Sequence, residues 1–523
     1  MSVTATPPRP LFSWNLREED RSRLLALVLD ALTLGITAWV FLTLNKPFLT
    51  NYPGYDEEFF TWGGWCITKG LTLYKDFLEF KPPISFLTHA IAIALFGLKH
   101  YGYRTFFTIV PLGAILLLQL SLLARGLERF LTLAAVVGFV ALFLSPAYHD
   151  TALSDCESIG VTYYVLGLAA FLWQGAGTDV VVGAGGFFMS CAVLSKEPIG
   201  GVVVVTWCGA FFIRNATSLA QAKRFARASL LGVGTFFLLL CLYMVPTGAM
   251  SAYIDLIQSY QRIYRDPKTS YCVAVVGNPG WGFAPAWKHI REVFLNESTL
   301  GYLAPLALPG AVFALRRSVW LFLSVLAATA AGLWASVPTL CMWLHYCVMS
   351  MAGVLYVLVV SLDSLRVPLA SAPRRVRIGA SAVACVAVAM YVWPSFEQLS
   401  RAQFQRIPWQ EPQRGLLAFI ASHTRPTDRI FTTGTPQLYA QADRVSALRE
   451  TNIIDDILSS YDGATDEERL RPLQRELAAH RPRVVFIDPE NEWRKGRHLR
   501  TLVYPYLERH HYRKINDRLY LRP

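Results

Sequence analysis

Three carboxylates stand side by side in Tyr55-Asp56-Glu57-Glu58, directly after the first long apolar run of the chain. A carboxylate at the edge of a membrane is partly desolvated, and desolvation raises its affinity for a proton. Such a group can act as a general base that takes the proton of an attacking hydroxyl. The alternative is that the acids form a solvated face or the first turn of a helix, and the spacing alone slightly favours this alternative.

A basic group follows in Lys81-Pro82-Pro83. Each proline locks its own φ, so the lysine ahead of them is held at a fixed angle. A lysine at the level of the lipid headgroups is a natural partner for a lipid phosphate. An interfacial anchor that snorkels toward water explains the same lysine equally well.

A second acidic group comprises Asp150, Asp155 and Glu157 and lies before a later apolar run. Lys196 lies at the corner Ser195-Lys196-Glu197-Pro198, between two short apolar runs. Ionisable side chains at the boundary of a span are costly and usually have a partner. A phosphate ligand, or an ion pair with Asp155, Glu157 or Glu197, would each explain this lysine.

Two further sets of residues are candidates for ligand binding. His345 and Tyr346 lie in a late apolar run, where a histidine is more often a satisfied core residue than a phosphate donor. Arg262 and Tyr264 lie in the polar stretch 248–298, which predicts an amphipathic segment with a role in acceptor or phosphate binding. The sequence shows no glycine-rich phosphate loop, metal-ligand pattern or serine-nucleophile motif. Paired acids facing basic groups suit a phosphate leaving group and a carboxylate base.

The elements that must position these residues follow from composition. The 523 residues are 53% hydrophobic and 16% charged, against roughly a quarter charged in soluble domains. Apolar blocks of about 15 to 22 residues fill the first three quarters. This predicts a mainly α fold, with a transmembrane bundle over 1–394 and a soluble α/β domain over 395–523, with strands near 429–434, 483–488 and 518–521. Much of the net charge of +12 lies in short loops, so we do not expect nucleic-acid binding.

The sidedness depends on the short apolar run from Ile84 to Leu98. If it crosses the membrane, the four basic loops that follow lie outside, against the positive-inside rule. If it lies along the outer surface as a juxtamembrane helix, all four lie inside, which leaves about eleven spans. The second topology is therefore predicted. It places the first loop (45–103), Lys196, the 248–298 stretch and the C-terminal domain together on the extracytoplasmic side.

These motifs together resemble the C-type glycosyltransferase superfamily (GT-C), in particular protein O-mannosyltransferases and bacterial lipid A aminoarabinose transferases. The resemblance covers nearly the whole chain. It is carried by Asp56-Glu57, Tyr74-Lys75-Asp76-Phe77, Lys81-Pro82-Pro83, Arg104 at the start of the second span, Asp155 or Glu157, Lys196 and His345-Tyr346.

The resemblance implies an enzyme of a bacterial inner membrane whose site faces the periplasm. It would transfer a hexosyl or pentosyl group, with inversion, from a polyprenyl-phosphate donor to a lipid, glycan or protein acceptor. Asp56, beside Glu57, would be the base, and Asp155 or Glu157 the second acid. The donor phosphate would be held by a basic set: Lys81, Arg104, Lys196 and His345 with Tyr346. No cofactor is certain, and the resemblance leaves the use of a divalent cation open.

Two other functions fit a bundle of this kind. A transporter or flippase for lipid-linked sugars would place ionisable residues at the bilayer midplane, on broken helices within repeats, and no repeat is visible here. A polysaccharide polymerase or ligase would use a pyrophosphate-linked donor.

Overall fold

The computed structural model describes most of the chain. The described residues are 18–50, 55–78, 81–99, 102–145, 153–174, 177–214, 218–265, 311–335, 347–401, 411–433, 436–449, 466–487 and 503–523. Among the predicted site residues, Asp150, His345 and Tyr346 lie outside this set. The side chains of Arg262 and Tyr264 also lie outside it.

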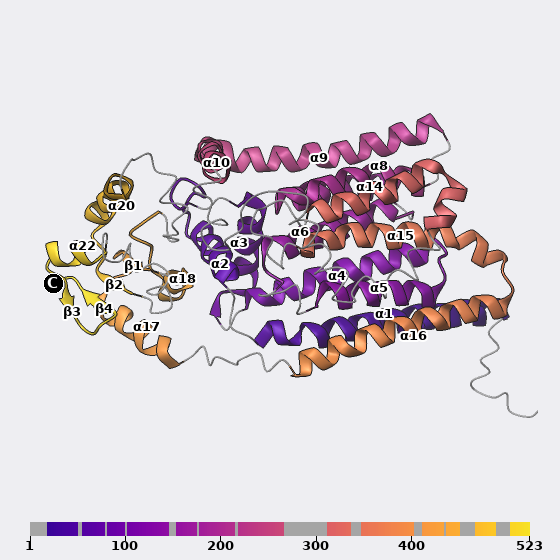
Figure 1. Cartoon of the computed structure of the whole chain (residues 1–523), viewed down its shortest axis with the longest axis horizontal. Helices are drawn as coiled ribbons and strands as arrows, with labels where there is room; N and C mark the ends of the chain where they lie inside the picture. The colour runs from indigo at the N-terminus through magenta and orange to yellow at the C-terminus, as the bar shows by residue number, and fades with distance from the viewer. Residues whose placement is uncertain are drawn as a thin grey trace, which may run out of the picture.

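Most of the described chain forms a bundle of apolar helices (Figure 1). Five of them are long and apolar enough to cross a membrane: α1 (Glu18–Thr50), α4 (Tyr103–Ala124), α9 (Leu219–Thr247), α15 (Cys347–Ser371) and α16 (Arg374–Arg401). Shorter apolar helices are α5 (Arg129–Phe143), α6 (Cys156–Leu172), α7 (Thr178–Val193), α8 (Gly200–Ile213), which follows the 3-10 turn η2 (Glu197–Ile199), and α14 (Val319–Ala335). The protein is a multi-pass membrane protein.

Burial separates the centre of the bundle from its lipid-facing rim. In the most apolar 18 residues of α15, 83% of the residues are buried inside the protein. The buried share of the corresponding stretch is 22% in α1 and 28% in α16. The outer helices expose leucine and valine side chains, as Leu238 and Leu242 of α9 do. Because exposed apolar side chains are costly in water and not in lipid, these faces are the ones that contact the bilayer.

Helices α2 (Tyr55–Thr68) and α3 (Pro83–Phe96) lie between the bundle and the C-terminal segment (Figure 1). Lys81, just before α3, pairs with Asp56, and Arg104, which follows α3, pairs with the neighbouring Glu57. A helix that crossed the membrane would have these two flanks on opposite sides. Helix α3 therefore does not cross, as the charge distribution predicted. The count of about eleven spans stays a prediction.

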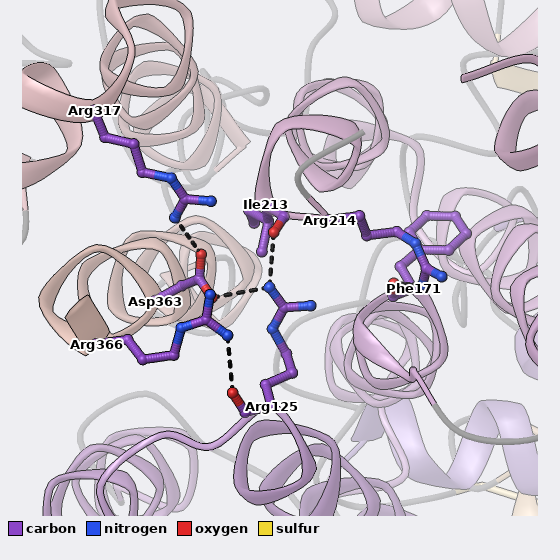
Figure 2. A network of polar contacts seen from close by, with 7 residues as sticks. All are labelled: Arg125, Phe171, Ile213, Arg214, Arg317, Asp363 and Arg366. Atoms are coloured by element: carbon purple, nitrogen blue, oxygen red, sulfur yellow. Dashed lines mark hydrogen bonds and ion pairs between the residues drawn. The ribbon is translucent and has the colours of Figure 1, made fainter. Parts of the chain in front are cut away.

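The basic loops gather at the opposite end of the bundle. Arg104 lies in the first turn of α4, beside α2, and Arg125 caps the far end of the same helix. There Arg125 and Arg317 both pair with Asp363, and Arg366 donates to the carbonyl of Arg125 (Figure 2). The grouping of basic loops on one side, predicted from the positive-inside rule, is thus present in the structure.

The C-terminal segment (Glu411–Pro523) combines a small sheet with short helices. The helices are α17 (Glu411–His423), α18 (Gln437–Ala442), α20 (Asp466–His480) and α22 (Tyr504–Arg509). The strands are β1 (Ile430–Thr432), β2 (Val484–Phe486), β3 (Arg513–Lys514) and β4 (Leu519–Leu521), in the order β1-β2-β4-β3. β1 and β2 are parallel, and the other pairs are antiparallel.

The three predicted strands are observed. β3 was not predicted, because its two residues are charged and exposed and show no apolar alternation. Helix α16 continues to Arg401, past the domain boundary predicted at residue 395.

The C-terminal segment rests on α2. The rings of Trp62 and Tyr439 lie 6.2 Å apart, and Lys69 pairs with Asp443 at 2.6 Å. The amide of Leu78 also donates to the carbonyl of Arg449 at 3.0 Å. The end of the bundle that carries α2 and α3 is therefore covered by this segment.

Close packing of α2 on α3 requires glycine at residue 64. A Cβ there would lie 2.5 Å from the Cβ of His89 and 2.8 Å from the amide nitrogen of Ala90. We expect Gly64→Ala to lower the midpoint of thermal unfolding in detergent, because overpacking costs about 1–3 kcal/mol. Gly113→Ala in α4 is the matched control, since its added Cβ meets nothing within 4 Å. Equal midpoints for the two variants would contradict this packing.

Candidate active site

The first turn of α2 carries the acidic group predicted to do chemistry. Asp56, Glu57 and Glu58 all lie in this turn, where the helix dipole favours negative charge. Successive residues of a helix point in different directions. Asp56 and Glu57 accordingly face different partners.

Glu57 is buried and held by two side chains of α4. Its Oε1 accepts hydrogen bonds from Arg104 Nε at 2.7 Å and from the Tyr103 hydroxyl at 2.8 Å, and its Oε2 accepts from Arg104 Nη2 at 2.8 Å. Glu57 is 0% exposed and Arg104 is 3% exposed. A buried bidentate ion pair requires a fixed geometry of the two side chains. The pair therefore holds α2 in a fixed position against α4, and we call it the Glu57–Arg104 clamp.

Asp56 is more accessible and pairs with Lys81. Its Oδ1 lies 3.0 Å from Lys81 Nζ, and the two side chains are 29% and 23% exposed. The ammonium group also lies 4.7 Å from the centroid of the Phe60 ring, a cation–π distance. The hydroxyl of Tyr74 donates to the carbonyl of Lys81 at 2.7 Å. Together with the following prolines, these contacts fix the direction of the lysine.

Glu157 and Lys196 form a second pair of the same kind. Their Oε1 and Nζ atoms lie 2.8 Å apart, and the side chains are 1% and 12% exposed. Asp155 instead caps the start of α6: its Oδ1 accepts a hydrogen bond from the amide nitrogen of Ser158 at 2.6 Å. Of the three acids considered as partners of Lys196, the structure therefore shows the ion pair with Glu157.

The two pairs belong to one site. The amide of Ile84, in α3, donates to the carbonyl of Leu194 at 3.2 Å, and this brings the start of α3 against the corner that carries Lys196. The hydroxyl of Ser85 also donates to the carbonyl of Ser195 at 3.4 Å. Residues from three distant segments of the sequence thus converge at one end of the bundle.

Helix α10 (Ala249–Arg265) lies over the same region. Its Tyr253 ring stacks on Tyr74, with centroids 4.6 Å apart, and burial, together with the nearby charge of Glu197, raises the pKa of Tyr253. The sequence predicted an amphipathic segment here, and Arg262 and Tyr264 lie in the last turns of this helix.

Four contributors to the site were not predicted: Phe60, Tyr103, Cys156 and Tyr253. Tyr103 directly precedes Arg104, so its position at the start of a span was a usable signal. Phe60 lies one helical turn after Asp56, which also could have indicated that both face Lys81. Among the described residues, no three His, Cys, Asp or Glu side chains are grouped as a metal site would require.

The arrangement can exchange one anion for another. Each lysine faces a carboxylate, so the four charges of the two pairs balance. A phosphate that contacts both ammonium groups would compete with the two carboxylates for them. A carboxylate released from its lysine binds a proton more readily, because a neighbouring positive charge lowers the affinity of an acid for a proton.

No protein-family model and no curated protein sequence matches this chain. Solved structures with a similar fold do match. The Archaeoglobus fulgidus oligosaccharyltransferase in complex with Zn and sulfate has 14% identity and a TM-score of 0.52, over 92% of this chain and 71% of that chain. AglB from the same organism, in complex with an inhibitory peptide and a dolichol-phosphate, has 14% identity and a TM-score of 0.51. The match covers 94% of this chain and 74% of that chain.

ArnT from Cupriavidus metallidurans, bound to undecaprenyl phosphate, has 12% identity and a TM-score of 0.48, over 89% of this chain and 94% of that chain. The chain is therefore similar in fold to GT-C proteins, as the motifs indicated.

The Glu57–Arg104 clamp gives a test by double substitution. We expect Glu57→Gln to cost about 3–5 kcal/mol of unfolding free energy, because it leaves the Arg104 charge buried without its partner. Adding Arg104→Met should recover part of that loss, and thermal unfolding in detergent measures both. Asp443→Asn, which breaks the exposed pair with Lys69, should cost about 1 kcal/mol or less. If the cost in unfolding free energy of the double variant equals the sum of the costs of the two single variants, the residues are not a coupled pair.

Proposed function

We propose that this protein is a membrane glycosyltransferase that transfers a sugar from a polyprenyl-phosphate carrier to an acceptor hydroxyl. The observation that carries the proposal is the convergence of Asp56–Lys81 and Glu157–Lys196 in one site at one end of the membrane bundle. The similar fold of AglB, whose structure contains a dolichol-phosphate, supports the choice of donor class.

The lysines are the proposed ligands of the carrier phosphate. The contacts of Ile84 with Leu194 and of Ser85 with Ser195 bring the segments that carry Lys81 and Lys196 together, and the phosphate is placed between these two lysines. Before the donor binds, each ammonium group is held by its carboxylate, which keeps it in place without a net buried charge. During transfer, the two ammonium groups stabilise the charge that develops on the leaving phosphate.

Asp56 is the proposed general base. It is accessible, and it loses the neutralising contact of Lys81 when the donor phosphate takes that lysine. Glu57, fully buried in its pair with Arg104, positions Asp56 through the shared helix turn. Arg104, predicted as a donor ligand, has this positioning role in the proposed mechanism. Glu157 is the second acid, because Asp155 caps α6.

The reaction is a single displacement. The acceptor oxygen attacks the anomeric carbon of the sugar, and Asp56 takes the hydroxyl proton as the bond forms. The bond from that carbon to the phosphate oxygen breaks, and the polyprenyl phosphate leaves with the electron pair. Attack from the face opposite the leaving group inverts the configuration. A metal ion is not needed to balance this step, and the proposal leaves its use open.

The basic cluster around Asp363 supports a site that faces the periplasm of a bacterial inner membrane. Loops rich in arginine remain in the cytoplasm, and they lie at the end of the bundle opposite to Asp56. The acceptor is a lipid, a glycan or a protein, and the transferred group is a hexose or a pentose. His345 and Tyr346 stay proposed donor ligands, and Arg262 and Tyr264 proposed acceptor ligands.

Donor turnover tests the assignment. Purified enzyme is incubated with a panel of radiolabelled polyprenyl-phosphate sugars and a mixed acceptor pool. We expect Asp56→Asn to reduce transfer by roughly 10²–10⁴-fold while donor binding remains, because only the proton acceptor is lost. Lys81→Ala should weaken donor binding as well as transfer, because it removes a phosphate ligand.

Asp179→Asn is the matched control, since Asp179 also forms an ion pair, with Arg224 at 2.8 Å, but far from the site. It should transfer sugar like the wild type. If Asp56→Asn transfers sugar as fast as the wild type, Asp56 is not the general base. Turnover of pyrophosphate-linked donors alone would point to a polymerase or ligase. Movement of intact donor across vesicles without transfer would point to a transporter.

A further inference from the structure

A polar cavity lies at the end of the bundle opposite to the proposed active site. Its volume is about 330 Å³, and α1, α5, α15 and α16 contribute to its wall. Its charged lining consists of Asp30, Glu128, Arg129, Arg366 and Arg377. None of these residues takes part in the proposed transfer reaction.

The acids of the cavity are already engaged. Asp30 forms an ion pair with Arg129. Glu128 caps α5 by accepting the amide hydrogen of Leu131 at 2.7 Å, and it accepts a second hydrogen bond from the Ser381 hydroxyl at 2.8 Å. Within the described residues, neither carboxylate forms an ion pair with Arg366 or Arg377, and the lining carries three guanidinium groups against two carboxylates.

Those two arginines leave positive charge facing the cavity. Arg366 donates to the carbonyl of Arg125 at 2.9 Å, and a carbonyl is a neutral partner (Figure 2). Within the described part of the chain, the Arg377 guanidinium makes no hydrogen bond or ion pair.

A network of largely buried charges lies behind the cavity. Arg125 and Arg317 both pair with the carboxylate of Asp363, at 2.9 and 2.5 Å (Figure 2). Arg125 is buried, and its Nε and Nη1 atoms have no acceptor among the residues that the structure describes. A cavity with this excess of guanidinium groups favours an anion, and guanidinium groups bind phosphate in particular.

The apolar surroundings indicate that the phosphate belongs to a lipid. Helices α1 and α16 are at the lipid-facing rim of the bundle. The helices α1, α5 and α16, which line the cavity, expose large apolar side chains: Leu27 is 66% exposed, Phe130 40% and Ile378 57%. Acyl chains therefore contact this rim of the bundle, so a lipid headgroup is available to the cavity from the side of α1 and α16.

We propose that this cavity binds the phosphate of an anionic phospholipid headgroup, with Arg366 and Arg377 as its ligands. The lipid would join α1, α15 and α16, which are far apart in the sequence. Helix α1 leads to α2 and Asp56, and α16 leads toward the C-terminal segment. A lipid bound in the cavity therefore stabilises the helices that support α2 and the C-terminal segment.

Thermal unfolding of the delipidated full-length protein in detergent tests this proposal. We expect phosphatidylglycerol to raise the midpoint of the wild type, and phosphatidylcholine at the same concentration to leave it unchanged. The double variant Arg366→Gln/Arg377→Gln should lose the shift. The control double variant Arg374→Gln/Arg375→Gln removes the same charge from the same end of α16, outside the cavity lining. It should keep the shift of the midpoint with phosphatidylglycerol.

Arg377→Gln alone covers the case in which the double variant does not fold, since Arg377 is exposed and holds no described side chain. It should reduce the shift. Equal shifts in the wild type and in Arg377→Gln would overturn the site. Equal losses in both double variants would show diffuse attraction of lipid instead. An equal shift with inorganic phosphate alone would overturn the assignment to a lipid.

Discussion

The buried pair of Glu57 and Arg104 determines how the rest of the candidate site is placed. Glu57 is fully buried, so the guanidinium group of Arg104 must meet it in a fixed bidentate geometry. This contact joins α2 to the first turn of α4. The neighbouring Asp56 is then directed toward Lys81, and α3 must start and end on the same side of the membrane. A functional carboxylate is thus positioned by a neighbour that takes no direct part in the proposed chemistry.

Charge is separated between the two ends of the bundle. Two lysine–carboxylate pairs occupy one end, and an arginine-rich network around Asp363 occupies the other. Charged groups are costly at the centre of a bilayer, and both sets lie at the ends of the bundle. The pairs at the first end are balanced, which suits exchange with a phosphate. The network at the second end has surplus positive charge, which suits an anionic lipid surface.

Much of this organisation could be predicted without coordinates. Apolar blocks predicted the helices, and basic loops predicted the common sidedness, because lipid and the positive-inside rule act on local composition. The same reasoning excluded Ile84–Leu98 as a span, and the ion pairs on both flanks of α3 agree. The short strands of the C-terminal segment were recognisable from their apolar runs. The two-residue β3 was not, because it has no pattern of its own.

The sequence by itself determined a multi-pass helical protein with acids and lysines at one membrane face. Only the tertiary structure decided how these charges are paired. Glu57 and Asp56 are adjacent and chemically alike, but one is buried against Arg104 and the other is accessible beside Lys81. Asp155 and Glu157 differ in the same way, as helix cap and lysine partner. Pairing depends on the direction of each side chain and on contacts between distant segments, and local composition contains neither.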